Sequence, residues 1–356
     1  MNYQKLELHI TQIQRTIALC KNSFPNHSKK QVVYDNLIKL FNAIKKSNYH
    51  QFKIEDLDNT KGSLDIIYNG IQFLDYKDEN EIPKRLIFCL NLALNDWIID
   101  GTNKYYIVIS HNNNLTEFLF VNDLDEGLVD AYNLWANGKF SVSYRPALIQ
   151  ISKPKFLFDD FLGSTPVYHE LGHFIDNNYQ ITKNLFRNPF FKDKIQAHYG
   201  EHFADIFAAQ YIGKSCIEPL NYNAPNTRNI DVDTHPSNEM RINVVNAFLN
   251  NSSTPEAKEI VNHLMSAVSE RGYGELKIRY LDLKEDPFEI LSPIKLDMPS
   301  KVHSLFLKGW EHWLNTASLI RKKYPDPNEC CNKINEIIKE TIEKTMEQEI
   351  SDVGIN

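Results

Sequence analysis

Cysteine is scarce in this sequence, and no two cysteines are spaced as C-x-x-C. The 356 residues include five cysteines, an odd number, at positions 20, 89, 216, 330 and 331. Disulfide-stapled domains and cysteine-ligated zinc sites use sets of cysteines at short, regular spacings. The cysteine content therefore argues against both, and it favours a reducing, cytoplasmic setting.

Long apolar runs are also missing. A membrane-spanning helix needs roughly 18 consecutive apolar residues, and no stretch of the sequence approaches that length. Within the first twenty residues, Lys, Glu, Gln or Arg interrupts the apolar positions every few residues, so we expect no signal peptide. The sequence predicts no membrane span and a cytoplasmic location, with export as an effector without a cleaved signal as the alternative.

The chain has no excess of positive charge. Its formal net charge is −7 and its pI is about 6.0, so it lacks a global positive field that would attract nucleic acid or anionic lipid. We therefore predict no nucleic-acid partner. Apolar residues make up 42% of the chain and aromatic residues 12%, which is enough for a large core and argues against wholesale disorder.

What is present in the first hundred residues is a helical pattern. Apolar residues recur at steps of three and four positions, first at Leu6, Ile10, Ile13 and Ile17, and then at Val33, Leu37, Leu40, Phe41 and Ile44. A third periodic stretch runs from Leu86 to Trp97, after Pro83 and before Gly101, as in a helix with Pro in its first turn. We expect residues 1–100 to be all-helical.

A small sheet is predicted between this region and the middle of the chain. Residues 105–110 and 115–121 are rich in β-branched and aromatic residues and flank a His-Asn-Asn-Asn turn, which predicts a hairpin. A further strand-like run covers residues 140–151, and its Pro146 favours an edge position or a bulge. We expect the strand near residues 147–152 to be an edge strand, which can pair with an extended chain.

Residues 169–173 carry the central motif, His-Glu-Leu-Gly-His, in a helical context. Positions i and i+4 of a helix project from one face, so His169 and His173 can reach the same metal ion. Glu170 lies beside them and is predicted to be the general base that takes a proton from the attacking water. Zinc with three protein ligands and one open position suits this chemistry.

A third ligand is expected in the run Gly-Glu-His-Phe-Ala-Asp at residues 200–205. Glu201 and Asp205 share a helix face, so Glu201 can bind the metal while Asp205 accepts a hydrogen bond from a ligand imidazole. The small Ala204, Ala208 and Ala209 would let this helix pack closely on the first. His198 and His202 are the rival third ligands.

These residues resemble the gluzincin superfamily of zinc metallopeptidases. The HExxH motif followed at short distance by Glu201-x-x-Ala204-Asp205 resembles the ImmA/IrrE-type cytosolic peptidases. The run Thr-His-Pro-Ser at residues 234–237, with Arg241 after it, resembles the HtpX and Oma-type peptidases. The latter carry membrane helices, so their role in membrane-protein quality control is not expected here. The resemblance covers roughly residues 100–250 and implies one Zn²⁺ per chain.

Other zinc families fit less well. A metzincin would have Gly three residues and His six residues after His173, whereas this sequence has Asp176 and Tyr179. Asp176 could reach a ligand, but we interpret it as a solvated acidic residue at a helix end.

The remaining helices are expected at residues 159–179, 197–213, 236–250, 254–270, 299–324 and 328–349, with a loop at 214–235. The predicted fold is α+β and mainly helical. It has a zincin-like core of a small mixed sheet with an edge strand, the HExxH helix and the Glu helix. We expect a helical region at 1–100, the metallopeptidase core at 101–250 and a helical region at 251–356 that packs on the core.

The sequence therefore predicts a soluble zinc metallopeptidase that hydrolyses peptide bonds of a protein or peptide substrate. The alternative is a regulatory or effector protein of toxin or anti-phage type on the same scaffold, with one specific substrate or little general proteolysis. The substrate and the oligomeric state are left open.

A donor for the developing oxyanion is also expected opposite the metal. Pro236 as the first residue of a new helix would hold His235 at its N-terminal edge and place Arg241 inside it. We predict that His235 is catalytic and that Arg241 supports the site; Tyr199 and Tyr168 are the other candidate donors. The alternative is a surface histidine and an arginine paired with Asp205 or Glu239.

Overall fold

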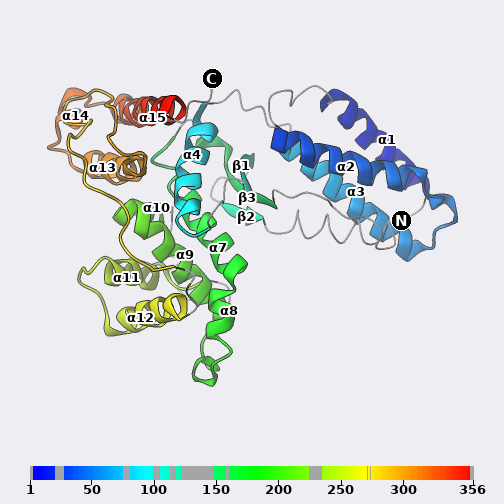
Figure 1. The fold of residues 1–356 in the computed structure, drawn as a ribbon, viewed down its shortest axis with the longest axis horizontal. Helices are drawn as coiled ribbons and strands as arrows, with labels where there is room; N and C mark the ends of the chain where they lie inside the picture. The colour runs from blue at the N-terminus through cyan, green and yellow to red at the C-terminus, as the bar shows by residue number, and fades with distance from the viewer. Residues whose placement is uncertain are drawn as a thin grey trace. The chain divides into compact units, whose positions relative to one another are not determined.

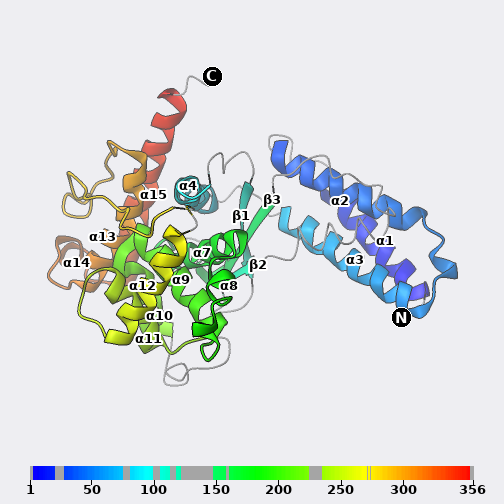
Figure 2. The same ribbon diagram turned by 60° about the horizontal axis from the view of Figure 1, so that its bottom comes forward.

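The computed structural model describes residues 3–20, 28–74, 81–98, 105–112, 118–121, 147–157, 160–223, 235–270, 272 and 274–352. It is mainly helical with one small sheet, as predicted. The chain forms two compact units (Figures 1 and 2). Unit 1 comprises residues 1–80, 102–110 and 121–150, and unit 2 comprises residues 81–101, 111–120 and 151–356. The predicted boundaries at 100 and 250 do not coincide with this division.

The described part of unit 1 contains three helices with their own hydrophobic core. They are α1 (Tyr3–Cys20), α2 (Ser28–Lys46) and α3 (Ile54–Leu74), with the short 3-10 helix η1 (Tyr49–Gln51) between the last two. The periodic residues found in the sequence, such as Leu6, Ile13 and Leu40, are fully buried in this core. The amphipathic pattern therefore predicted α1 and α2 correctly, whereas none of the periodic stretches falls in α3.

The third periodic stretch forms α4 (Glu81–Asn95), with Pro83 in its first turn as expected. It does not join the other N-terminal helices, because it belongs to unit 2. There it contacts α7 and α15, and its Leu86, Leu90 and Leu94 are fully buried. The amphipathic pattern of α4 indicates which of its faces is buried, but it does not indicate which helices cover that face.

The sheet differs from the prediction in its pairing. Strands β1 (Tyr105–Asn112), β2 (Leu119–Val121) and β3 (Ala147–Pro154) are ordered β1-β3-β2. The expected hairpin between the first two strands is wrong, because β3 lies between them. The expected edge strand at 147–152 is wrong for the same reason, since β3 has a neighbour on both sides. Residues 140–146 of the predicted run lie outside the described part.

The middle of unit 2 is built from α7 (Pro166–Tyr179), α8 (Ile181–Leu185) and α9 (Gln196–Ile212), after the short η2 (Lys155–Leu157). Helix α7 begins seven residues later than expected. Helix α9 is the central element: it contacts α7, α8, α11, α12 and α13, and its residues 201–212 are all buried. A helix that is covered on every side needs apolar or small residues on most of its surface, and the run from Phe203 to Ala209 supplies them at every position except Asp205.

Helix α11 (Asn238–Phe248) and α12 (Pro255–Ser269) follow. Pro236 is not the first helical residue of α11, because Ser237 is the N-cap and accepts a hydrogen bond from the Met240 amide. The stretch 214–235, expected to be a loop, contains the end of η4 (Gly213–Cys216) and all of α10 (Glu218–Asn223).

The C-terminal elements are η5 (Pro299–Lys301), α13 (Val302–Leu314), α14 (Leu319–Lys323) and α15 (Pro327–Asp352), grouped in orange and red in Figure 2. The expected helix at 299–324 is therefore divided into three. As predicted, this region packs on the rest of unit 2, where α13 contacts α9. Among the described residues, no helix has the length and apolarity to cross a membrane.

Candidate metal centre

The backbones of α7 and α9 touch where Gly172 meets Ala204. A Cβ atom at Gly172 would lie 2.8 Å from the Ala204 Cα and 3.1 Å from its carbonyl oxygen. Only glycine allows this approach without a shift of the backbone. The contact places the histidines of α7 opposite the carboxylates of α9. The prediction that small residues allow close packing of these helices is confirmed for Ala204.

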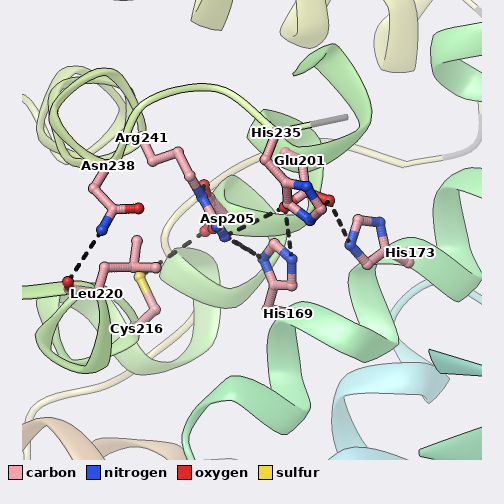
Figure 3. A network of polar contacts seen from close by, with 9 residues as sticks. All are labelled: His169, His173, Glu201, Asp205, Cys216, Leu220, His235, Asn238 and Arg241. Carbon is pink, nitrogen blue, oxygen red and sulfur yellow. Dashed lines mark hydrogen bonds and ion pairs between the residues drawn. The ribbon is translucent and has the colours of Figure 1, made fainter. Parts of the chain in front are cut away.

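Two imidazoles and one carboxylate converge at this contact (Figure 3). The Nε2 atom of His169 lies 3.4 Å from Glu201 Oε2, and that of His173 lies 3.3 Å from Glu201 Oε1. One ligand atom from each of these three residues lies within 4.8 Å of the others. The side chains are 12%, 24% and 11% exposed, so the group is largely shielded but open on the His173 side. The arrangement can hold one metal ion.

Asp205 fixes the orientation of His169. Its Oδ1 atom lies 2.9 Å from His169 Nδ1, so that nitrogen donates a hydrogen bond and Nε2 is the atom that faces Glu201. A carboxylate behind a histidine ligand sets the tautomer and raises the basicity of the coordinating nitrogen. The donor set of two Nε2 atoms and a carboxylate therefore fits a zinc ion with an open position.

Arg241 holds Asp205 in turn. Its Nε and Nη2 atoms donate to the two carboxylate oxygens of Asp205 at 2.8 and 2.7 Å, and Nη2 lies 3.5 Å from Glu201 Oε2. A guanidinium can donate two parallel hydrogen bonds to the two oxygens of one carboxylate, as it does here. Arg241 therefore forms an ion pair with Asp205, as the alternative interpretation of the sequence expected. Because Asp205 also binds His169, this ion pair is part of the centre.

The pKa values of His169 and Glu201 are shifted by these contacts. Burial by itself would lower the pKa of His169, but the charge of Asp205 and hydrogen bonds to Asp205 and Glu201 raise it to about 10. Burial would raise the pKa of Glu201, but hydrogen bonds from His169 and His173 hold it well below its usual range. The carboxylates thus stabilise positive charge between the imidazoles and Glu201, where a cation would bind.

His235 lies directly before α11 and is close to the group. Its Nε2 atom is 3.7 Å from Glu201 Oε1, and its side chain is 58% exposed (Figure 3). The Asn238 side chain donates to the Leu220 carbonyl at 3.3 Å and so links the start of α11 to α10. The structure therefore brings His235 and Arg241 to the centre although they follow His173 by more than sixty residues.

Glu170 is buried on α7, next to His169, with 7% of its surface exposed. The negative charge of Glu170 contributes to a raised pKa of Arg241, after the larger contribution of Asp205. Glu170 is not one of the three residues whose ligand atoms converge. Its role as a general base stays a prediction.

The rival third ligands are not part of the group. Among the described residues, the set that could hold a metal here contains Glu201 and neither His198 nor His202. His202 is 2% exposed, and burial lowers its pKa to about 4.

The alternative donors are engaged elsewhere. Tyr168 is fully buried, and its hydroxyl hydrogen-bonds His303 Nδ1 at 2.8 Å. Tyr199 packs edge-on against Phe186 and Phe191. Within the described part of the chain, neither tyrosine is hydrogen-bonded to Glu201, whereas His235 lies 3.7 Å from it.

The interpretation of Asp176 as a solvated residue is wrong. It is 6% exposed and accepts hydrogen bonds from the Thr182 amide at 2.8 Å and the Thr182 hydroxyl at 2.5 Å. It therefore joins the end of α7 to the start of α8. A carboxylate that receives such bonds satisfies the backbone of the next helix and does not need water.

A second group, Asp286, Glu289 and His312, also has ligand-type atoms within 4.8 Å of one another among the described residues. Its histidine and aspartate form a hydrogen bond of 3.0 Å, and Glu289 is exposed. Sequence reasoning missed this group because its members have no motif spacing. An ordinary His–Asp pair accounts for it.

Comparisons of this chain with protein-family models, with curated proteins and with solved structures found no match. The fold and the site by themselves define a mainly helical protein with a candidate metal centre formed by His169, His173 and Glu201.

Proposed function

We propose that this protein is a zinc-dependent metallopeptidase of the gluzincin type that hydrolyses peptide bonds of a protein substrate. The observation that carries the proposal is the convergence of His169, His173 and Glu201 on one point, with Asp205 behind His169. The acidic residue of the HExxH motif is present beside them. A site that only stored a metal would have no need of that acid.

Zinc bound at such a centre polarises a peptide carbonyl and lowers the pKa of water to about 7. Glu170 takes a proton from the attacking water and later delivers it to the leaving amine, which is the work of a general base and then a general acid. Glu170 directly follows His169 on α7, and 7% of its surface is exposed.

The other residues have separate tasks. His235 donates a hydrogen bond to the oxyanion that develops on the carbonyl oxygen, because its exposed ring lies on the open side of Glu201. Asp205 keeps His169 in the tautomer that presents Nε2, and Arg241 keeps Asp205 and Glu201 in place. Side chains that their neighbours hold in place in this way reduce the cost of assembling a metal site.

Substitution of Glu170 by Gln tests this proposal. We expect the variant to keep one zinc per chain, measured by atomic emission, and to lose hydrolysis of a casein-type substrate, because Gln cannot carry the proton. His169→Ala and His173→Ala should lose the metal as well as activity. Retained hydrolysis in Glu170→Gln would contradict the mechanism.

Wild type and Glu170→Gln also distinguish a general peptidase from an effector with one specific substrate. New protein N-termini mapped in cells that express wild type or Glu170→Gln would reveal one substrate or many. Stoichiometric zinc without cleavage of casein, but with a single new N-terminus in cells, would indicate one dedicated substrate. Absence of zinc from the purified wild type would contradict the metallopeptidase.

A further inference from the structure

The segment between α8 and α9, residues 186–195, differs in charge from the rest of the chain. It includes the short η3 (Pro189–Phe191) and carries Arg187, Lys192 and Lys194 against one acid, Asp193. This is a local net charge of +2 in a chain of net charge −7. In Figure 1 the segment extends beyond the end of α8. We call it the basic loop.

The cations of the basic loop are not used inside the protein. All three are exposed, and none makes an ion pair with any residue in the described part of the chain. Glu259 of α12 forms its ion pair with His263, at 3.9 Å. Their charges are therefore available to an external partner.

The basic loop also exposes large apolar side chains on a fixed base. Phe190 is 60% exposed and Ile195 is 43% exposed, whereas the neighbouring Phe191 is 3% exposed. The Phe191 ring packs against Tyr199 at 5.6 Å and against His263 at 5.0 Å between ring centroids. The anchored Phe191 keeps Phe190 in place, so binding through Phe190 costs little conformational entropy.

The basic loop ends close to the metal centre. Ile195 is the N-cap of α9, and the ligand Glu201 lies six residues further along, which corresponds to about 9 Å of helix rise. An extended peptide advances about 3.3 Å per residue, so about three residues span that distance. A peptide with its scissile bond at the centre can therefore reach the basic loop.

We propose that the basic loop recognises the substrate, and that it selects a peptide segment with acidic residues and one large apolar residue about three positions from the scissile bond. This inference rests on the proposed peptidase function and adds the substrate class. The acidic chain as a whole would repel such a segment, so the local positive charge is needed to bind it. Phe190 and Ile195 supply the apolar contact.

Peptide binding to the zinc-loaded Glu170→Gln protein tests this inference without the need for cleavage. The probe is a fluorescent decapeptide of Asp, Glu and Leu, and the reference peptide has Asn and Gln in place of the acids. We expect fluorescence anisotropy to give at least about tenfold tighter binding of the acidic peptide at low salt. Lys192→Glu/Lys194→Glu should remove this preference. Phe190→Ser should weaken the binding of both peptides by about tenfold.

Matched variants control for charge and apolar surface. Lys295→Glu/Lys322→Glu changes the net charge equally at exposed lysines, and Leu314→Ser removes a side chain that is 55% exposed. Both control variants should bind the acidic peptide with an affinity within about twofold of that of the parent protein. Equal losses in the loop and control variants, or no preference for the acidic peptide, would overturn the inference.

Cleavage assays and vesicle binding distinguish a failure of substrate recognition from a failure of the peptidase. If wild type cleaves the peptides and the loop variants cleave them equally well, the recognition role fails while the peptidase stands. If the acidic peptide binds through the loop, but neither peptide is cut and no new protein N-terminus appears in cells, the loop binds acidic peptides while the peptidase fails, and with it the role in substrate recognition. Binding of phosphatidylserine vesicles through the loop, with loop-independent peptide binding, would overturn the inference in favour of a membrane surface.

Discussion

His235 is the most exposed of the described side chains that lie within 4 Å of a Glu201 carboxylate oxygen, and this exposure separates it from the residues proposed to hold the metal. His169 and Arg241 are buried against Asp205, whereas the His235 ring is 58% exposed and 3.7 Å from Glu201. A group that meets the substrate must be reachable from solvent. A group that orients a ligand must be fixed by its neighbours.

This difference predicts the behaviour of His235→Ala. We expect turnover to fall by about a hundredfold, because one oxyanion donor is lost, while zinc content stays at the wild-type level. The measurement is kcat with zinc determined in the same sample. His235→Gln keeps an N–H donor and should recover part of the activity. Loss of zinc in His235→Ala would instead make the residue a ligand, and unchanged kcat would remove it from the site.

At the scale of elements, the contact of α7 with α9 at Gly172 determines whether the centre can form. Gly172→Ala would place a methyl group 2.8 Å from the Ala204 Cα, so the helices must separate. We expect unit 2 to lose about 1–3 kcal/mol of stability. Hydrogen exchange of the α7 amides measures this loss.

Gly62 in α3 is the matched control for that substitution. It is an exposed helix residue with no atom within 4 Å of the position that a Cβ would occupy. Gly62→Ala should therefore stabilise its helix by about 0.5–1 kcal/mol. Stability changes of the same sign in the two variants would contradict the close contact.

The contact of α7 with α13 has a pH dependence of its own. Burial lowers the pKa of His303 to about 3, and its neutral ring accepts the Tyr168 hydroxyl. In the unfolded chain the pKa is about 6.5, so only the unfolded state takes up the proton between these values. Stability linked to His303 is complete above pH 6.5 and is lost as the pH falls towards 3, by at most about 1.4 kcal/mol per pH unit.

His303→Gln tests this linkage, because the Gln side chain can still accept the Tyr168 hydrogen bond but does not titrate. We expect its free energy of unfolding to decrease less than that of wild type between pH 6.5 and 4.5. Urea unfolding at several pH values supplies the comparison. Parallel pH profiles for the two proteins would rule out the predicted contribution.

For the whole molecule, the division into two units predicts where a bound metal acts. All of the residues proposed to bind the metal belong to unit 2, whereas α1, α2 and α3 have their own core in unit 1. A ligand stabilises the part of the protein that binds it, by RT ln(1 + [L]/Kd). We expect zinc removal by a chelator to speed hydrogen exchange in α7 and α9 and to leave α1–α3 unchanged. Equal changes in both units would contradict this division of stability.

Much of the helical content could be predicted because helix periodicity is a local property. Leu6 and Ile13 of α1, and Ile334 and Ile338 of α15, lie at helical spacing in the sequence and are fully buried. Strand pairing is not local in this way. The strand character of residues 105–110 and 147–151 was evident, but which strands lie side by side depends on contacts between distant parts of the chain.

The components of the centre can be read from the sequence: two histidines at i and i+4, an acid between them, and a Glu and an Asp four residues apart on a second helix. Which of these side chains meet depends on how the helices pack. The choice of Glu201 over His198 and His202, the pairing of Arg241 with Asp205, and the burial of Asp176 all follow from helix packing. Helix spacing fixes the face on which a residue lies, whereas the close approach at Gly172 and Ala204 fixes what that face meets.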